Sequence, residues 1–221
     1  MELSVGVYDL AGGAETVSGG EGRTYDTASV VKVDILAALL LRAQDAAREL
    51  SGRERAYAAA MIERSDNDAA TALWRAIGGA AGLDAANERL GLTETVGAAA
   101  WGLTQTTVRD RLALLRAVFG AESALDARSR GYLGTVMSRT VAGQDWGVSA
   151  AGTGRAVKNG WLPRSATGLW VVNSTGRVTA GGRTFLVAVL SDGHGSMEAG
   201  VSAVEGAARA AVRAVVRGAL S

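Results

Sequence analysis

The stretch TASVVKVDILAALLL, residues 27–41, decides how the chain folds. It is apolar nearly all round, which is typical of a helix buried in the middle of a domain and not of a helix on its surface. Ser29 and Lys32 stand in its first turn. Residues three apart share one helical face, so the hydroxyl and the amine are expected to meet. A buried lysine is costly unless it serves a purpose, which makes this turn a candidate site.

Strand patterns flank this helix at both ends of the chain. Residues 3–10 alternate apolar with small or polar residues, and a turn at residues 11–13 leads into a second strand-like stretch that ends near Tyr25. Helical patterns separated by glycine-rich breaks fill the middle of the chain. We predict helices over residues 53–63, 67–77, 82–90, 107–119, 126–137 and 197–218, and late strands over residues 155–161, 168–174 and 184–190.

These elements predict an α+β fold. Short hairpin connections between the late strands favour an antiparallel sheet. The simplest architecture is a five-stranded antiparallel sheet assembled from both chain ends and covered by the terminal helix, with a block of helices inserted between the second and third strands. We therefore expect a sheet subdomain of residues 1–26 and 147–221, and an all-helical subdomain of residues 27–146.

Composition excludes several classes of function. The 221 residues include 23 basic and 22 acidic side chains, and this balance favours neither nucleic acid nor an anionic membrane as a partner. A single histidine, His194, and the lack of cysteine cannot supply the usual ligands of zinc, so we expect no metal or other cofactor. The most apolar run, residues 35–41, is too short to span a bilayer. Residues 1–5 do not have the pattern of a signal peptide.

The chain uses lysine at only two positions, which suggests a catalytic role for them. Of the 23 basic residues only Lys32 and Lys158 are lysine. A lysine can lose its proton when it is buried or crowded by another cation, whereas an arginine effectively never does. The alternative is that both are ordinary surface residues, and their sequence contexts decide between the two.

Three short motifs contain both lysines. S-x-x-K spans residues 29–32, Ser65-Asp66-Asn67 lies in a turn between predicted helices, and Lys158-Asn159-Gly160 ends a predicted strand. A serine becomes a nucleophile when a neighbouring base takes its proton, and a desolvated lysine beside a second cation can be that base. Each motif alone has a plain alternative; Ser65 or Asp66 would simply cap the following helix. Together, in this order and on these elements, they indicate an acyl-transfer site.

The joint pattern resembles the penicillin-recognising serine hydrolases, and most closely the class A β-lactamases and their relatives. The resemblance covers nearly the whole chain in the order of its elements and implies the β-lactamase/transpeptidase-like fold. It implies that Ser29 attacks a β-lactam or peptide carbonyl, that Lys32 accepts its proton, and that Ser65, assisted by Lys158, passes a proton to the departing nitrogen. The charge of Lys158 would also attract a substrate carboxylate.

The same resemblance implies the substrate-binding residues. Asn67 would hold the amide on the acyl side, and the backbone N–H groups of Ser29 and Trp161, the residue after Gly160, would form the oxyanion hole. Asn159 stands where the family has the threonine or serine that binds the substrate carboxylate. We therefore expect altered affinity or substrate choice at this position.

A second departure concerns hydrolysis of the acyl-enzyme. Class A enzymes hold the hydrolytic water with an E-x-x-x-N loop, and the corresponding residues 92–107 have no such motif. Glu94 is the only carboxylate there, and an ordinary solvated loop residue is the favoured interpretation. We expect acylation with slow deacylation. Trp101 and Trp161 are expected at the site, while His194 and Arg164 are expected to be loop and hairpin residues.

Three functions remain open at this stage. The first is a serine acyl hydrolase that acts on β-lactams, the second a D-alanyl-D-alanine carboxypeptidase, and the third a protein that captures β-lactams or muropeptides without turnover. The resemblance also implies a monomer without membrane insertion that works outside the cytoplasm, because these substrates lie there.

Overall fold

The computed structural model describes residues 1–20 and 22–218. Residues 21 and 219–221 of the predicted sheet subdomain lie outside the described residues. Five strands form one antiparallel sheet in the order β2-β1-β7-β6-β5, so the two chain ends meet in its middle, where β1 pairs with β7. The strands are β1 Glu2–Asp9, β2 Glu15–Gly19, β5 Thr153–Pro163, β6 Trp170–Ala180 and β7 Arg183–Asp192.

The segment between β2 and β5 is mostly helical, and one more helix follows β7. The predicted fold class is therefore confirmed. The α-helices are α1 Lys32–Asp45, α2 Gly52–Glu63, α3 Asn67–Ile77, α4 Gly79–Arg89, α5 Val108–Phe119, α6 Ala127–Ser138 and α7 Met197–Gly218. The 3-10 turns are η1 Ala28–Val31, η2 Trp101–Leu103 and η3 Gly147–Ala151.

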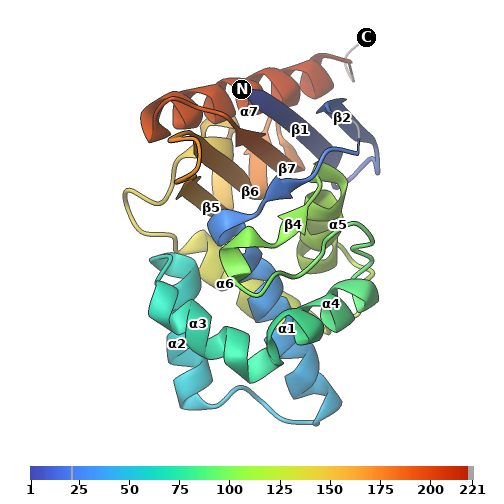
Figure 1. Cartoon of the computed structure of the whole chain (residues 1–221). Coiled ribbons are helices and arrows are strands. Elements are labelled where there is room, and N and C mark those ends of the chain that lie inside the picture. The colour runs from blue at the N-terminus through green and yellow to red at the C-terminus, as the bar shows by residue number, and fades with distance from the viewer. Residues whose placement is uncertain (21, 219–221) are drawn as a thin grey trace.

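The sheet separates two hydrophobic cores. Helix α7 lies across one face, and the inserted helices lie on the other side (Figure 1). Side chains alternate along β7, so that Val187 and Val189 pack in the core beneath α7 while Ala188 and Leu190 pack in the core of the inserted helices. This alternation explains why β7 reads as a nearly continuous apolar run.

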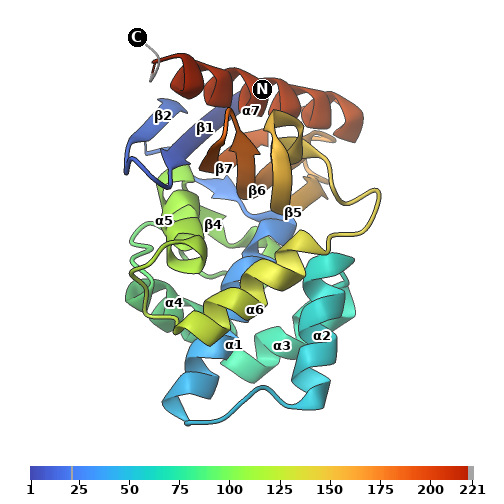
Figure 2. The same cartoon turned by 180° about the vertical axis from the view of Figure 1, so that it is seen from behind.

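Helix α1 is the centre of the helical layer. Every residue from Lys32 to Leu41 is buried, and α3, α4 and α6 pack around the helix (Figure 2). The all-round apolar pattern of this stretch reflects that position. None of the helices in the described part of the chain is long and apolar enough to cross a membrane.

Two features of the chain around Ser29 were not predicted. A two-stranded ladder pairs β3, Tyr25–Asp26, with β4, Gln105–Thr106, just before the central helix. The expected single helix also begins as the 3-10 turn η1, so Ser29 lies in η1 and Lys32 is the first residue of α1. The ladder ties the start of η1 to the loop before α5.

Candidate active site

The backbone before Ser29 is held in an unusual conformation. Ala28 has φ of +47°, a left-handed value that is costly for a residue with a side chain. Gly160 of β5 lies directly against this turn, because a Cβ at that position would come within 2.6 Å of the Ser29 nitrogen and 2.9 Å of the Val30 nitrogen. Only a glycine lets β5 approach the backbone at the start of η1 so closely.

Lys32 is buried and bound to the turn between α2 and α3. Its Nζ donates to the Ser65 carbonyl oxygen at 2.6 Å, to Ser65 Oγ at 3.1 Å and to Asn67 Oδ1 at 2.8 Å. The ring of Trp101, in η2, lies 4.9 Å from the same nitrogen. Burial lowers the pKa of Lys32 to about 7, against an opposing effect of the Asp66 carboxylate. A large fraction of this amine is therefore neutral near pH 7.

Lys158 reaches the same serine from β5. Its Nζ donates to Ser65 Oγ at 2.9 Å and to the Asn159 carbonyl oxygen at 2.9 Å. Burial, and then the positive charge of Lys32, hold the pKa of Lys158 well below the usual value for lysine. The two lysines of the chain thus meet at one hydroxyl, although 126 positions separate them in the sequence.

The Ser65-Asp66-Asn67 turn is both a helix cap and part of the polar cluster, the two alternatives that the sequence left open. Asp66 caps α3, since its Oδ1 accepts the Ala69 N–H at 2.7 Å. Ser65 adopts a left-handed conformation, with φ of +58°, and presents its hydroxyl to the lysines while Asn67 binds Lys32. A cap and a polar cluster therefore occupy the same three residues.

The Ser29 and Lys32 side chains, which were expected to meet, form no hydrogen bond with each other. Ser29 is partly exposed, and in the described part of the chain the hydrogen bonds of Lys32 go to Ser65 and Asn67 instead. Residues three apart in a 3-10 turn lie on one face, so the winding of η1 does not separate the two side chains. The amine of Lys32 is instead engaged by oxygens of the turn between α2 and α3. The Ser29 hydroxyl carries no hydrogen bond within the described residues, which leaves it free toward an incoming carbonyl.

Asn159 does not contribute its side chain to this group. Its Nδ2 donates to the carbonyl oxygens of Gln144 at 2.9 Å and Trp146 at 2.8 Å, and its Oδ1 accepts from Ser174 Oγ at 2.6 Å. Neighbouring residues of a strand point to opposite faces, so Lys158 and Asn159 cannot both face Ser65. The prediction that the Asn159 amide replaces the family hydroxyl toward a substrate carboxylate is therefore wrong.

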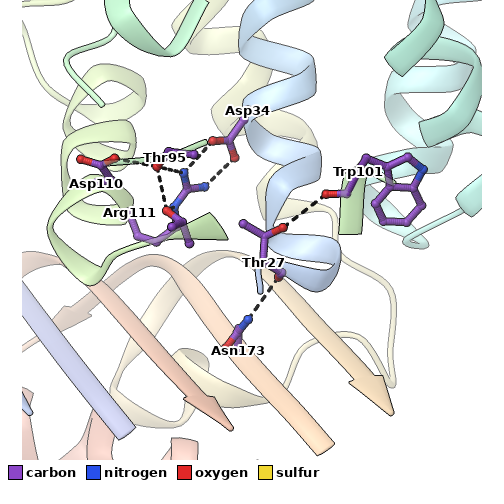
Figure 3. A network of polar contacts seen from close by, with 8 residues as sticks. Thr27, Asp34, Thr95, Trp101, Asp110, Arg111 and Asn173 are labelled. Carbon is purple, nitrogen blue, oxygen red and sulfur yellow. Dashed lines mark hydrogen bonds and ion pairs between the residues drawn. The ribbon is translucent and has the colours of Figure 1, made fainter. Parts of the chain in front are cut away.

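A buried polar network fixes α1 against α5 and the loop before it (Figure 3). The carboxylate of Asp34, two residues beyond Lys32, accepts hydrogen bonds from both terminal nitrogens of the Arg111 guanidinium, with N···O distances of 2.5 and 2.6 Å. Both side chains are fully buried. Arg111 also donates to Thr106, and Asp110 accepts from Thr95 at 2.6 Å. The network therefore locks the loop that carries Trp101 to the helix that carries Lys32.

The remaining sequence candidates bind residues other than Ser65 and the two lysines. Glu94 is exposed, and its carboxylate accepts from Thr107 Oγ1 at 2.9 Å, at the start of α5. His194 is buried in the loop after β7 and bonds to Ser191 at 2.8 Å. Arg164 pairs with Asp26 at 2.5 Å. Asp66 was predicted only as a possible helix cap. The effect of its carboxylate on the pKa of Lys32 had no signal in the sequence beyond its place in the motif.

Comparisons with known proteins agree with this architecture. The sequence profile of the beta-lactamase enzyme family matches residues 53–215. No curated protein sequence matches the chain. Similar solved structures include PBP-A, 23% identical, with a TM-score of 0.81 over 98% of this chain and 91% of that one.

Two further structures extend this likeness. The TLA-1 extended-spectrum beta-lactamase is 19% identical, with a TM-score of 0.85 over 97% of this chain and 93% of its own. A variant of PBP-A, solved as an acyl-enzyme complex with penicillin G, is 23% identical, with a TM-score of 0.80 over 97% of this chain and 90% of its own. At these identities the likeness establishes the fold.

Proposed function

The chain belongs to the beta-lactamase enzyme family, and from that premise we propose that it is a serine acyl hydrolase in which Ser29 forms an acyl-enzyme with β-lactams. The observation that carries the proposal is the position of Ser65 Oγ, within 3.1 Å of Lys32 Nζ and 2.9 Å of Lys158 Nζ. Two lysines that share one hydroxyl form a path along which a proton can move. The similar PBP-A variant that holds penicillin G as an acyl-enzyme supports the choice of ligand.

Acylation proceeds in two steps. Ser29 Oγ attacks the lactam carbonyl carbon and forms a C–O bond, while the neutral amine of Lys32, three residues further along the chain, takes the hydroxyl proton. This transfer requires that binding of the substrate bring the Ser29 hydroxyl within hydrogen-bonding distance of the amine. The negative charge that develops on the carbonyl oxygen is stabilised by the backbone N–H groups of Ser29 and Trp161. The close approach of Gly160 to the Ser29 nitrogen supports this pairing of backbone donors.

The second step breaks the carbon–nitrogen bond. Ser65 Oγ gives its proton to the departing nitrogen and receives one from the Lys32 ammonium, with which it shares a 3.1 Å contact. Lys158 steadies the Ser65 hydroxyl during this exchange. No proton is gained or lost overall, because the one taken from Ser29 ends on the leaving nitrogen. Asn67, held by Lys32, orients the acyl-side amide of the substrate.

We further propose that deacylation is slow. Hydrolysis of the ester needs a base that activates water, and the Glu94 carboxylate is engaged with Thr107. The D-alanyl-D-alanine carboxypeptidase and the non-hydrolytic binder use the same four side chains, so they are the alternatives to this function. We expect the protein to act as a monomer outside the cytoplasm, where cell-wall substrates lie.

Pre-steady-state hydrolysis of a chromogenic cephalosporin tests the proposal. We expect a burst of about one equivalent of product followed by slow turnover, because acylation precedes a limiting deacylation. The Ser29→Ala variant should show neither phase. A linear time course with fast turnover would contradict slow deacylation, and release of D-alanine from a D-alanyl-D-alanine peptide without any reaction toward the cephalosporin would favour the carboxypeptidase.

A further inference from the structure

The indole of Trp101 lies over the amine of Lys32. Its ring centroid is 4.9 Å from Lys32 Nζ, within the distance of about 6 Å at which a cation and a ring attract each other. A water between them would need a hydrogen bond of about 2.9 Å to the amine and a contact of about 3.5 Å to the ring, which is more than this separation allows. The ring therefore keeps water off the side of the amine that it covers.

Hydrogen bonds at both ends of Trp101 hold this ring in place. Its Nε1 donates to Thr71 Oγ1 of α3 at 3.3 Å, and its carbonyl oxygen accepts from Thr27 Oγ1 at 3.5 Å (Figure 3). The next residue, Gly102, lies against η1, since a Cβ there would stand 3.9 Å from the Cα of Ala28. Trp101 is thus fixed beside the turn that carries the proposed nucleophile.

Oxygen atoms surround the rest of the Lys32 amine. Its Nζ donates to the carbonyl oxygen and the hydroxyl of Ser65 and to Asn67 Oδ1. Three acceptors are as many as an ammonium group can use. Lys32 is 0% exposed, so solvent does not reach this nitrogen.

Neutral Lys32 would promote hydrolysis of the acyl-enzyme if water reached it. In the proposed function Lys32 returns its proton through Ser65 and is neutral again once Ser29 is acylated. A neutral amine can act as a general base: the water oxygen would bond to the ester carbonyl carbon while the amine takes a water proton. The carbon–oxygen bond to Ser29 would then break as that proton passes to Ser29 Oγ. The engagement of Glu94 does not prevent this step.

We propose that Trp101 is a positioning residue that makes the acyl-enzyme long-lived, because its ring excludes water from the amine of Lys32. The inference rests on the proposed function for the acyl-enzyme itself. Acylation does not need water at the amine, since the proton that Lys32 accepts in that step comes from the Ser29 hydroxyl. The ring therefore slows the second half of the reaction and not the first.

Trp101→Ala tests the inference by separating the two steps. Quenched-flow mixing with benzylpenicillin gives the rate constant for acylation, and loss of the adduct after removal of free penicillin gives that for deacylation. The variant opens a space for water beside Lys32. Deacylation should become about tenfold to 100-fold faster, a part of the acceleration that a general base supplies, while acylation does not become faster. Trp101→Phe, which keeps a ring, should stay close to the unmodified protein.

Trp170→Ala is the matched control. Trp170 is partly exposed, as Trp101 is, but it packs against the core beneath α7, so its loss should change neither rate constant. A merely structural effect of Trp101→Ala would slow acylation and leave deacylation slow. Unchanged deacylation in Trp101→Ala, or an equal acceleration by Trp101→Phe or Trp170→Ala, would overturn the inference. Should Trp101→Ala fail to fold, Trp101→Leu, which also lacks the flat ring, decides by the same criteria.

Acetylation of the two lysines separates this inference from the proposed function. Acetic anhydride reacts with the neutral amines that it can reach, and peptide mapping compares Lys32 with Lys158, which has no contact with the Trp101 ring within the described residues. We expect Trp101→Ala to raise the acetylation of Lys32 relative to Lys158 severalfold. A penicilloyl adduct on the unmodified protein together with an unchanged acetylation ratio overturns the inference about Trp101 alone. Absence of any adduct together with a raised ratio overturns the acyl-enzyme and supports the exclusion of water by the ring.

Discussion

The pH dependence of acylation follows from the burial of Lys32. The amine is fully buried and hydrogen-bonded to Ser65 and Asn67, and burial lowers its pKa to about 7. Lys32 acts as a base in its neutral form, so the rate constant for acylation by benzylpenicillin should rise with pH and level off above the pKa. For a pKa of about 7 the neutral fraction is about 9% at pH 6 and about 91% at pH 8, a tenfold increase in rate.

Asp66→Asn tests the same reasoning in the opposite direction. The Asp66 carboxylate raises the pKa of Lys32 against the effect of burial, so its removal should lower the pKa and make the rate at pH 6 a larger share of the rate at pH 8. Asparagine is as good a helix cap as aspartate, so α3 should keep its N-terminus. Quenched-flow mixing with mass detection of the adduct gives the rate constant at each pH. A flat profile between pH 6 and pH 8, a midpoint near that of free lysine, or a midpoint raised by Asp66→Asn would refute the reasoning.

Three further predictions have defined outcomes. The pKa of Lys32 is about 7 in the folded protein, below its value near 10.5 in the unfolded chain, so the folded state binds fewer protons between these pH values and gains stability as pH rises. In urea titrations at pH 7.5 and 9.5, the free energy of unfolding should rise relative to that of the Lys32→Met variant by up to ~1.4 kcal/mol per pH unit. A fall in this difference would contradict the prediction. Asp34→Asn leaves the buried Arg111 guanidinium without a counter-charge and should cost about 3–5 kcal/mol by urea denaturation. Asp45→Asn breaks an exposed ion pair and should cost far less, because solvent screens that pair. Equal losses in the two variants would be inconsistent with the buried network. Gly160→Ala puts a Cβ within 2.6 Å of the backbone nitrogen of Ser29 and should slow acylation about 100-fold or more, as loss of an oxyanion donor does. An unchanged rate in quenched-flow assays would show that acylation does not depend on the close approach of Gly160.

The sequence was sufficient for the fold because its local patterns agree with one another. The apolar stretch at residues 35–41 has no polar face, and α1 is indeed surrounded by other helices. Apolar runs with short turns between them gave the antiparallel order of the late strands, and β5, β6 and β7 pair in that way. The motif order also led to Ser65 and Lys158, whose side chains are in contact.

Asn159 shows where motif matching misled. The position of Asn159 within the family motif suggested that its side chain binds the substrate. Side chains alternate between the two faces of a strand, however, so once Lys158 is assigned to the site, Asn159 must face the other way. The strand alternation was available in the sequence and was the better guide. The partners of Asn159 in the segment before η3 carry no such local signal.

The buried pair of Asp34 and Arg111 marks a limit of local patterns. A carboxylate in a helix that is otherwise apolar indicates that a partner is needed, but 77 positions separate the two residues. The many arginines of the chain give no sign of which one enters the core. Trp101 over Lys32 depends in the same way on a loop whose path is set by distant hydrogen bonds to Asp110.

Peptide mapping after reaction with benzylpenicillin tests the central claim most directly. The claim is that the hydroxyl of Ser29, in the turn that leads into Lys32, accepts an acyl group. We expect a stable adduct of one penicilloyl group on the peptide that contains Ser29, and none on the Ser29→Ala variant. An adduct on Ser65 or on any other residue, or none on a folded protein, would contradict the account.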